Sequence, residues 1–232
     1  LLAGLVQIGG ARRLLQLNLQ LADPALRRLQ LLCGLGELRT QLIPLLAGLS
    51  MLAATVAKRI HAPQSVVFFE TGGIDPSLAE LPLSVADPRV MVGTCMNSGL
   101  LDAFSLLAHR RLRTIAFLGA AQIDPFGNIN STCLGDYHRP KVRFPGCGGA
   151  CDAASLAFGV IIFMQQEKKR FVEKVDYLSS VGWLRGGNSR WEAGYKRGGP
   201  MAVVTNLGVM KFDEQSRRMY LSACYPGVAP AQ

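Results

Sequence analysis

The sequence predicts an α/β fold: an open, mostly parallel sheet flanked by helices, with hairpin-linked strands at the C-terminal end. Short apolar runs alternate with helical patterns along most of the chain. Glycine-rich loops follow several of these runs, as they do where strands end in α/β proteins. The 232 residues, 49% of them hydrophobic, are enough to bury a core, which excludes global disorder.

The N-terminal part of the chain differs from the rest. Residues 1–46 are rich in Leu, Arg, Gln and Gly, contain few β-branched residues, and show no apolar period that holds across them. From about residue 47 onward the apolar runs and helical patterns alternate, without a linker or an internal repeat. We therefore expect a divergent leucine-rich segment over 1–46 and one domain over 47–232.

The first elements of this domain are predicted from apolar spacing and from Pro and Gly. A helical pattern that begins at residue 50 or 55 ends at His61, just before Ala62-Pro63. The unbroken apolar run Val66–Phe69 predicts a buried strand that stops at Glu70. The next two expected elements are an amphipathic helix over 97–113 and a buried strand over 114–118.

Glycine loops and further strands complete the predicted domain. Turn-forming residues fill 119–128, and Gly146–Ala150 precedes a helical pattern over 151–158. An apolar run over 160–164 predicts the next buried strand. Three later runs, separated by short turns, predict hairpin-linked strands at the sheet edge; they cover 201–205, 209–212 and 219–224.

The basic charge of the chain does not indicate a nucleic-acid-binding protein. The net charge is +9, but residues 1–60 hold seven basic and two acidic side chains, so more than half of the excess lies near the N-terminus. Later basic clusters stand near helix ends or beside acidic residues, as on solvated helix faces. Aromatic residues are only 7% of the chain, too few for a base-stacking platform.

A membrane span and a metal site are also not expected. Residues 40–57 are uncharged, but they include Pro44, Gly48 and several polar residues, which is unfavourable for a span. The six cysteines lack paired metal-ligand spacing, and Cys147 and Cys151, four residues apart, are interpreted as small buried residues instead of a metal or redox pair. Reduced thiols and the absence of a convincing secretory signal predict a cytoplasmic protein.

Two features suggest catalysis by a carboxylate. Glu70 follows a buried strand and precedes glycine, the position at which α/β proteins place chemistry. The turn at Gly148-Gly149 opens a helix, and its backbone N–H groups would stabilise an oxyanion without an intervening side chain. An ordinary turn at Glu70, and glycines that only satisfy positive φ angles, are the structural alternatives.

Several separated blocks, in order, resemble the β subunits of the glutaconate CoA-transferases, within family I of the CoA-transferases. The resemblance runs from about Gly48 to the C-terminus, whereas the first 46 residues do not share it. The most specific block runs from Ala121 to Thr132. The other blocks are 56–59 with 62–63, 70–72, 119–137, 146–150, 167–177 and 211–226.

The resemblance implies roles for named residues. Glu70 stands where the family has its nucleophilic Glu, and Thr71 replaces the Ser that follows it. The implied reaction is ping-pong transfer through a glutamyl-CoA thioester, with Gly148 and Gly149 in the oxyanion-forming turn. Coenzyme A is then a substrate, and no cofactor or metal is expected.

Two further segments have open alternatives. Gln122, Gly127 and Asn128 either contact the acyl group or the pantetheine of coenzyme A, or belong to a tight loop organised by Asp124-Pro125. The Gly-rich stretch 185–197, with its Arg and Lys residues, either holds the phosphates of coenzyme A or is a surface loop, and we favour the loop.

The resemblance also implies partners and substrates. We expect a separate α subunit in a hetero-oligomer, and as substrates a dicarboxyl-CoA such as glutaconyl-CoA and a carboxylic acid such as acetate. The alternatives are an acyl-CoA hydrolase, in which water replaces the acid, and a non-catalytic structural subunit. Nucleic acid and membrane are not expected as partners.

Overall fold

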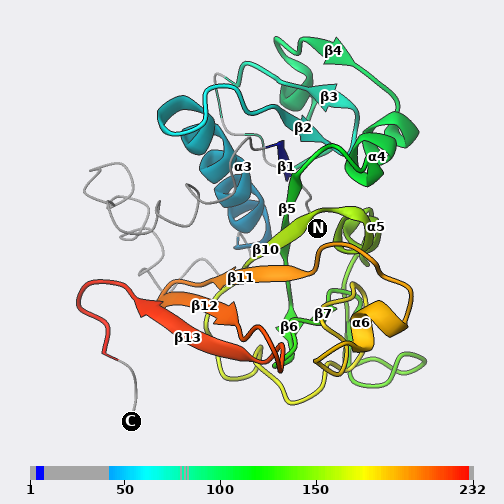
Figure 1. The fold of residues 1–232 in the computed structure, drawn as a ribbon, viewed down its shortest axis with the longest axis vertical. Helices are drawn as coiled ribbons and strands as arrows, with labels where there is room; N and C mark the ends of the chain where they lie inside the picture. Colours follow the sequence, from blue (N-terminus) through cyan, green and yellow to red (C-terminus); the bar gives the residue numbers. More distant parts are fainter. Residues whose placement is uncertain (1–3, 8–41, 79, 81, 83, 230–232) are drawn as a thin grey trace.

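The computed structural model describes residues 4–7, 42–78, 80, 82 and 84–229, so most of the divergent segment 1–46 lies outside the described residues. A nine-stranded sheet runs through the molecule, with strand order β13-β12-β11-β10-β5-β1-β2-β3-β4 (Figure 1). Its strands are β1 Gly4–Gln7, β2 Val67–Phe69, β3 Gly73–Ile74, β4 Met96–Asn97, β5 Thr114–Gly119, β10 Gly159–Phe163, β11 Pro200–Val204, β12 Gly208–Phe212 and β13 Met219–Cys224.

The sheet is parallel at its centre, where β5, β10 and β11 pair side by side. These strands are joined by long connections that contain helices, as parallel pairing requires. The pairs on either side of this centre are antiparallel, from β1 outward to β4 and from β11 outward to β13. The predicted open α/β sheet is confirmed, and so are the C-terminal hairpins, which join β11 to β12 and β12 to β13.

Two predicted helices have different bounds in the structure. Helix α3, Leu42–Ile60, begins earlier than expected because Pro44 falls in its first turn, where a missing backbone N–H costs no intrahelical bond. Helix α4, Leu100–Ala108, is shorter than the expected 97–113. Gly99 precedes α4 and donates its N–H to Asp102 at 3.2 Å, and the extended backbone of His109 ends the helix.

Shorter elements complete the fold. The remaining helices are α5 Ala150–Leu156, α6 Ser189–Glu192 and the 3₁₀ turn η2 Pro88–Met91. Two small two-stranded sheets are formed by β6 Gln122–Ile123 with β7 Ile129–Asn130, and by β8 Cys133–Leu134 with β9 Val142–Arg143. Among the helices that the structure describes, none is both long and apolar enough to cross a membrane.

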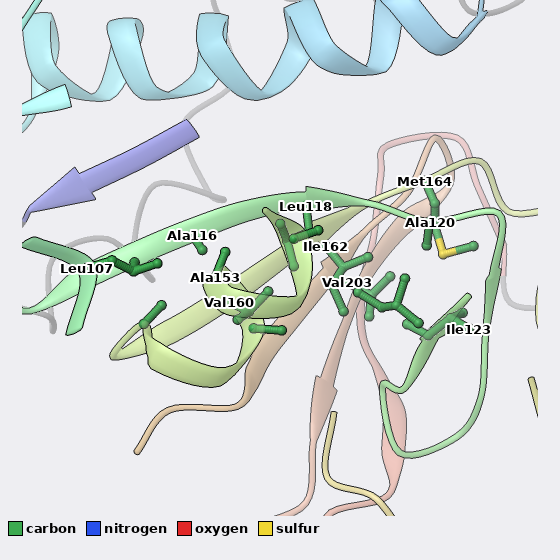
Figure 2. Close-up of a cluster of buried hydrophobic side chains, with 14 of the residues drawn as sticks. Leu107, Ala116, Leu118, Ala120, Ile123, Ala153, Val160, Ile162, Met164 and Val203 are labelled. Carbon is green, nitrogen blue, oxygen red and sulfur yellow. The ribbon is translucent and has the colours of Figure 1, made fainter. Parts of the chain in front are cut away.

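Helix α3 covers one face of the sheet, and α4 with α5 covers the other (Figure 1). The side chains of β5 alternate between these faces: Ala116 and Leu118 pack with α4 and α5, whereas Ile115 and Phe117 pack with α3. Figure 2 shows the larger core on the α5 side of β5 and β10, with α3 on the opposite side. Strand β2 alternates in the same way, with Phe68 on the α4 and α5 side.

Candidate active site

Glu70 lies at the edge of the sheet where the parallel strands end. Strands β2 and β5 are both antiparallel to β1, and Gly4 is opposite Phe69 on one side and Phe117 on the other. The two strands therefore run in the same direction, and their carboxyl ends share one edge. Because Glu70 directly follows Phe69, its backbone lies at that edge, which is where open α/β sheets bind ligands.

Helix α5 brings the glycine turn to the same edge. The helix leads back along the sheet to the start of β10, so it begins near the carboxyl ends of the strands. A methyl group placed on Gly149 would overlap both Oε2 of Glu70 and the ring of Phe104. Since φ of Gly149 is an ordinary −77°, glycine is needed there for close approach and not for backbone conformation.

The environment of the Glu70 carboxylate is unusually poor in polar partners. Its Oε2 atom is buried and accepts no hydrogen bond from the described residues. Burial raises the pKa of the Glu70 carboxyl above 4.5, and the nearby Asp152 carboxylate raises the pKa further, whereas the backbone amide of Gly149 lowers it. The Gly149 amide therefore offsets part of the cost of burying the carboxylate.

The glycine turn itself has two distinct parts. Gly146 and Gly148 adopt left-handed φ angles of 102° and 51°, so the structural alternative applies to them. The space beside Gly148 is open, because a methyl group there would have no neighbour within 4 Å. Within the described chain, the N–H of Ala150 bonds to the carbonyl of Cys147, but the N–H groups of Gly148 and Gly149 donate to no backbone carbonyl. No backbone carbonyl of the described chain therefore competes for these amides, and their expected oxyanion role stays a prediction.

Gln122, Gly127 and Asn128 lie in a second loop and make their contacts within the protein. The Asn128 amide nitrogen donates to Asp124 at 2.7 Å and to the carbonyl of Leu184 at 2.8 Å. Its oxygen accepts the N–H groups of Gly182 at 2.9 Å and Leu184 at 3.1 Å. These four bonds use the full capacity of the Asn128 side chain.

The other two predicted contact residues in this loop are also enclosed. Gln122 is buried and bonds to Asn130 at 2.7 Å and to Asp176 at 3.2 Å. A methyl group on Gly127 would meet Pro200 at 2.7 Å and Phe212 at 2.8 Å. These contacts favour the tight-loop alternative, and a role of the three residues in substrate binding stays a prediction.

Two arginines of the 185–197 stretch bond to backbone carbonyls of the protein. Arg190 is only 2% exposed and its guanidinium bonds to backbone carbonyls, while Arg197 bonds to the carbonyls of Ala108 at 2.9 Å and Leu112 at 3.1 Å. Burial lowers the pKa of Arg190 to about 10. Most of the stretch is exposed, as a surface loop would be, but Arg190 is buried, so the surface-loop interpretation is wrong for that residue. Since both guanidinium groups are bonded to backbone carbonyls, neither arginine is free to hold a phosphate.

Sequence reasoning missed two contributors to the site. Phe104 lies beside Gly149, on which an added methyl group would overlap both its ring and Oε2 of Glu70, but its position in an apolar helical pattern indicated only core packing. Asp152 stands in the first turn of α5, a usual place for a carboxylate, so nothing marked it as a neighbour of Glu70. Both residues are distant from Glu70 in the sequence, and tertiary packing brings them near it.

The cysteines of the glycine turn and other features of the described chain give no metal site. Cys147 and Cys151 are free thiols of intermediate exposure, and burial raises the pKa of Cys151. Within the described ranges, no group of three or more His, Cys, Asp or Glu residues is arranged to hold a metal ion. A hollow of about 300 Å³, crossed by the Lys58–Asp75 ion pair, is lined by the last turns of α3 and the chain after β3, and Glu70 does not line it.

Comparisons with known proteins agree on one family. A family model described as coenzyme A transferase matches residues 43–232. The B subunit of glutaconate CoA-transferase from Acidaminococcus fermentans is 45% identical over 195 residues, which cover 82% of this chain and 73% of that protein. The B subunit of 3-oxoadipate CoA-transferase from Pseudomonas knackmussii is 37% identical over 187 residues, which cover 80% of this chain and 71% of that protein.

A solved structure gives the same result for the fold. The crystal structure of glutaconate coenzyme A-transferase from Acidaminococcus fermentans matches with a TM-score of 0.75 and 44% identity. The match covers 78% of this chain and 72% of that chain. It supports the α/β fold described above.

Proposed function

The chain belongs to the coenzyme A transferase family, and from this premise we propose that it transfers coenzyme A between an acyl-CoA and a carboxylic acid, with Glu70 as the nucleophile. The observation that carries the proposal is the position of Glu70: a half-buried carboxylate with one unpaired oxygen, held against the N-terminal turn of α5 at the carboxyl edge of the sheet. A carboxylate without strong hydrogen bonds keeps its lone pairs available for attack.

The proposed first half-reaction exchanges the thioester onto the enzyme. A Glu70 oxygen attacks the acyl carbonyl, the carbon–sulfur bond breaks, and an acyl-glutamyl anhydride and the coenzyme A thiolate result. The thiolate then attacks the glutamyl carbonyl, which forms a glutamyl-CoA thioester and releases the original acyl group as a carboxylate. The incoming acid reverses these steps and leaves as the new acyl-CoA, so Glu70 is regenerated.

The neighbours of Glu70 fit this chemistry. The amides of Gly148 and Gly149 would donate hydrogen bonds to the oxyanion that forms at each attack. The ring of Phe104 adjoins the same carboxylate and would limit the access of water, which would otherwise hydrolyse the anhydride. The scheme uses coenzyme A as a substrate and needs no cofactor.

Substrate class and partner follow from the relatives. The two curated relatives are named for glutaconate and 3-oxoadipate, and both names specify dicarboxylic acids. We propose a dicarboxyl-CoA such as glutaconyl-CoA as one substrate and a small carboxylic acid such as acetate as the other. Because both relatives are named as B subunits, we also propose that this chain works in a hetero-oligomer with a separate α subunit.

The test is mass spectrometry of the chain purified with its partner subunit. The complex is incubated with a panel of short acyl-CoA and dicarboxyl-CoA esters, without an acceptor acid, and the peptide that contains Glu70 is analysed. We expect an adduct with the mass of coenzyme A on that peptide, and none in the Glu70→Gln variant. The donors that produce the adduct identify the acyl specificity.

Three outcomes would contradict the proposal. Steady release of free coenzyme A and acid without an acceptor would identify an acyl-CoA hydrolase. A folded complex that forms no adduct with any donor would instead indicate a non-catalytic subunit. A normal rate of transfer in Glu70→Gln would reject Glu70 as the nucleophile in either case.

A further inference from the structure

One segment connects the far ends of the two helices that adjoin Glu70. Arg190 and Arg197, which we call the arginine pair, both direct their guanidinium groups at backbone carbonyls of other elements. The Arg190 bonds run from Nε to Arg197 at 3.3 Å, from Nη1 to Val181 at 3.2 Å and Gly182 at 2.9 Å, and from Nη2 to Ala154 at 2.8 Å and Arg197 at 3.0 Å. All five N–H donors of Arg190 therefore have an acceptor.

The two arginines act on different helices. Arg190 binds the carbonyl of Ala154, in the last turn of α5. Arg197 binds the carbonyls of Ala108, the last residue of α4, and of Leu112 beyond it. The carbonyl of Arg197 in turn accepts two of the Arg190 bonds, so the pair links the C-terminal ends of both helices.

These are favourable places for a cation. The last four carbonyls of a helix have no intrahelical partner and carry the negative end of the helix dipole. A guanidinium satisfies such carbonyls with several bonds in a fixed planar arrangement, which a lysine ammonium does not reproduce. No carboxylate of the described residues forms an ion pair with Arg190 or Arg197. The carbonyls of helices and loops therefore stabilise the two positive charges.

The opposite parts of both helices adjoin the nucleophile. Gly149, just before α5, is close to both Phe104 of α4 and Glu70, because a methyl group on Gly149 would overlap both side chains. Ala154 is five residues after Gly149, a rise of about 8 Å. A shift of α5 as a unit therefore changes the distance between the glycine turn and the carboxylate.

We propose that Arg190 and Arg197 are positioning residues for the transfer reaction: they fix α5 and α4 so that the Gly149 turn and Phe104 stay in contact with Glu70. This inference rests on the proposed function. Arg190 is almost fully buried without a carboxylate partner, and such burial is expensive for fold stability alone. The arginine pair holds two helices beside the proposed reacting group, which gives a reason for the burial of Arg190.

The experiment compares three variants in the complete complex with the partner subunit. Arg190→Lys retains the charge but loses the planar set of donors, and Arg197→Gln removes the bonds to α4 from a partly exposed position. Arg218→Gln, at an exposed arginine between β12 and β13 without a side-chain contact in the described chain, is the matched control. Circular dichroism and urea unfolding determine the folded fraction of each variant.

Two readouts are measured on the folded protein. The first is the kinetics of transfer, with kcat and KM determined separately and over a range of pH. We expect kcat to fall about 100-fold in Arg190→Lys and about 10-fold in Arg197→Gln, with KM within about threefold, since a displacement of 1 Å is enough for such losses. The apparent pKa of the acidic limb should move in both variants and not in Arg218→Gln.

The second readout does not need activity. Iodoacetamide labelling of Cys147 and Cys151, at the start of α5, should become about tenfold faster when α5 is loosened, while the exposed Cys95 serves as internal reference. If the variants are labelled faster but the wild-type complex is inactive, the arginine pair fixes the helices as proposed and the proposed function is rejected. Folded variants with unchanged labelling and wild-type kcat, or with activity lost only in proportion to unfolding, would overturn the inference.

Discussion

Two loops of this protein contain glycines beside polar residues, and they differ in how completely their polar groups are paired. In the loop around Asn128, each polar side-chain group of Asn128 bonds to another part of the protein. In the turn before α5, the Gly148 and Gly149 amides donate to no backbone carbonyl, and the adjacent Oε2 atom of Glu70 is buried without a partner among the described residues.

The difference is the one we expect between a structural loop and the proposed reactive turn. Buried polar groups in folded proteins are nearly always hydrogen-bonded, so an exception needs a reason. A paired network such as that of Asn128 stabilises a loop, whereas polar groups without a partner in the protein can interact with a substrate. The predictions below test this contrast, beginning with the largest expected effect.

Glu70→Gln should reduce transfer by about 10⁴-fold or more, because the amide cannot form an anhydride or a thioester. The folded structure should be retained, since glutamine has the same shape and no charge to desolvate. Steady-state transfer assays of the complex, with thermal unfolding as the control, measure both effects. A variant that retains more than a few per cent of the activity would show that Glu70 is not the nucleophile.

Gly149→Ala should reduce kcat by about 100-fold, because the new methyl group overlaps Glu70 and Phe104 and displaces the carboxylate. Gly148→Ala is the matched comparison. The new methyl group has no neighbour within 4 Å, but the alanine must adopt a φ of 51°, which costs about 1 to 2 kcal/mol of stability. If Gly148→Ala loses more activity per folded molecule than Gly149→Ala, close approach at Gly149 is not what the site requires.

Asn128→Ala should destabilise the fold by about 2 to 4 kcal/mol, because it removes the side-chain bond to Oδ2 of Asp124 and the acceptor of the Gly182 and Leu184 amides. Transfer per folded molecule should remain close to wild type. Urea unfolding and kinetics at saturating substrate provide the comparison. The opposite result, unchanged stability with a strongly raised KM, would place Asn128 in substrate binding and restore the alternative interpretation of this loop.

The smallest effect concerns pH. The pKa of Glu70 is raised by burial, so the native state favours the protonated form, and this contribution to stability is complete below pH 4.5 and lost as pH rises through the native pKa. Wild type and Glu70→Gln should therefore be equally stable at low pH, and wild type should become the less stable above it. Each unit by which the pKa is raised corresponds to about 1.4 kcal/mol.

The pH dependence of activity should report the same ionisation of Glu70. Because the ionised carboxylate is the proposed nucleophile, kcat/KM should rise with pH through an apparent pKa above 4.5. Chemical unfolding and transfer assays over the same pH series test both statements. A stability difference between wild type and Glu70→Gln that does not change with pH would show that burial does not perturb Glu70.

Much of the fold was predictable because it depends on local patterns. The apolar runs of β2, β5, β10 and the C-terminal hairpins could be located from their composition and turn residues. The ends of α3 and α4 could not, since Pro44 is tolerated in a first helical turn and a continued apolar spacing does not reveal where the backbone turns away.

The candidate nucleophile and the glycine turn were also marked by the sequence alone, through residue type, strand end and family resemblance. Their relation was decided by the tertiary structure. Glu70 and Gly149 are far apart in the chain and meet because β2, β5 and α5 bring their ends to one edge of the sheet.

The state of each polar group was likewise decided by folding. Burial and missing partners, not residue identity, make one carboxylate oxygen unpaired, saturate Asn128, and enclose Arg190 among carbonyls. Local sequence determines which elements form, because propensity and apolar period act over a few residues. Solvation and pairing depend on the neighbours that long-range packing supplies, so only the tertiary structure determines them.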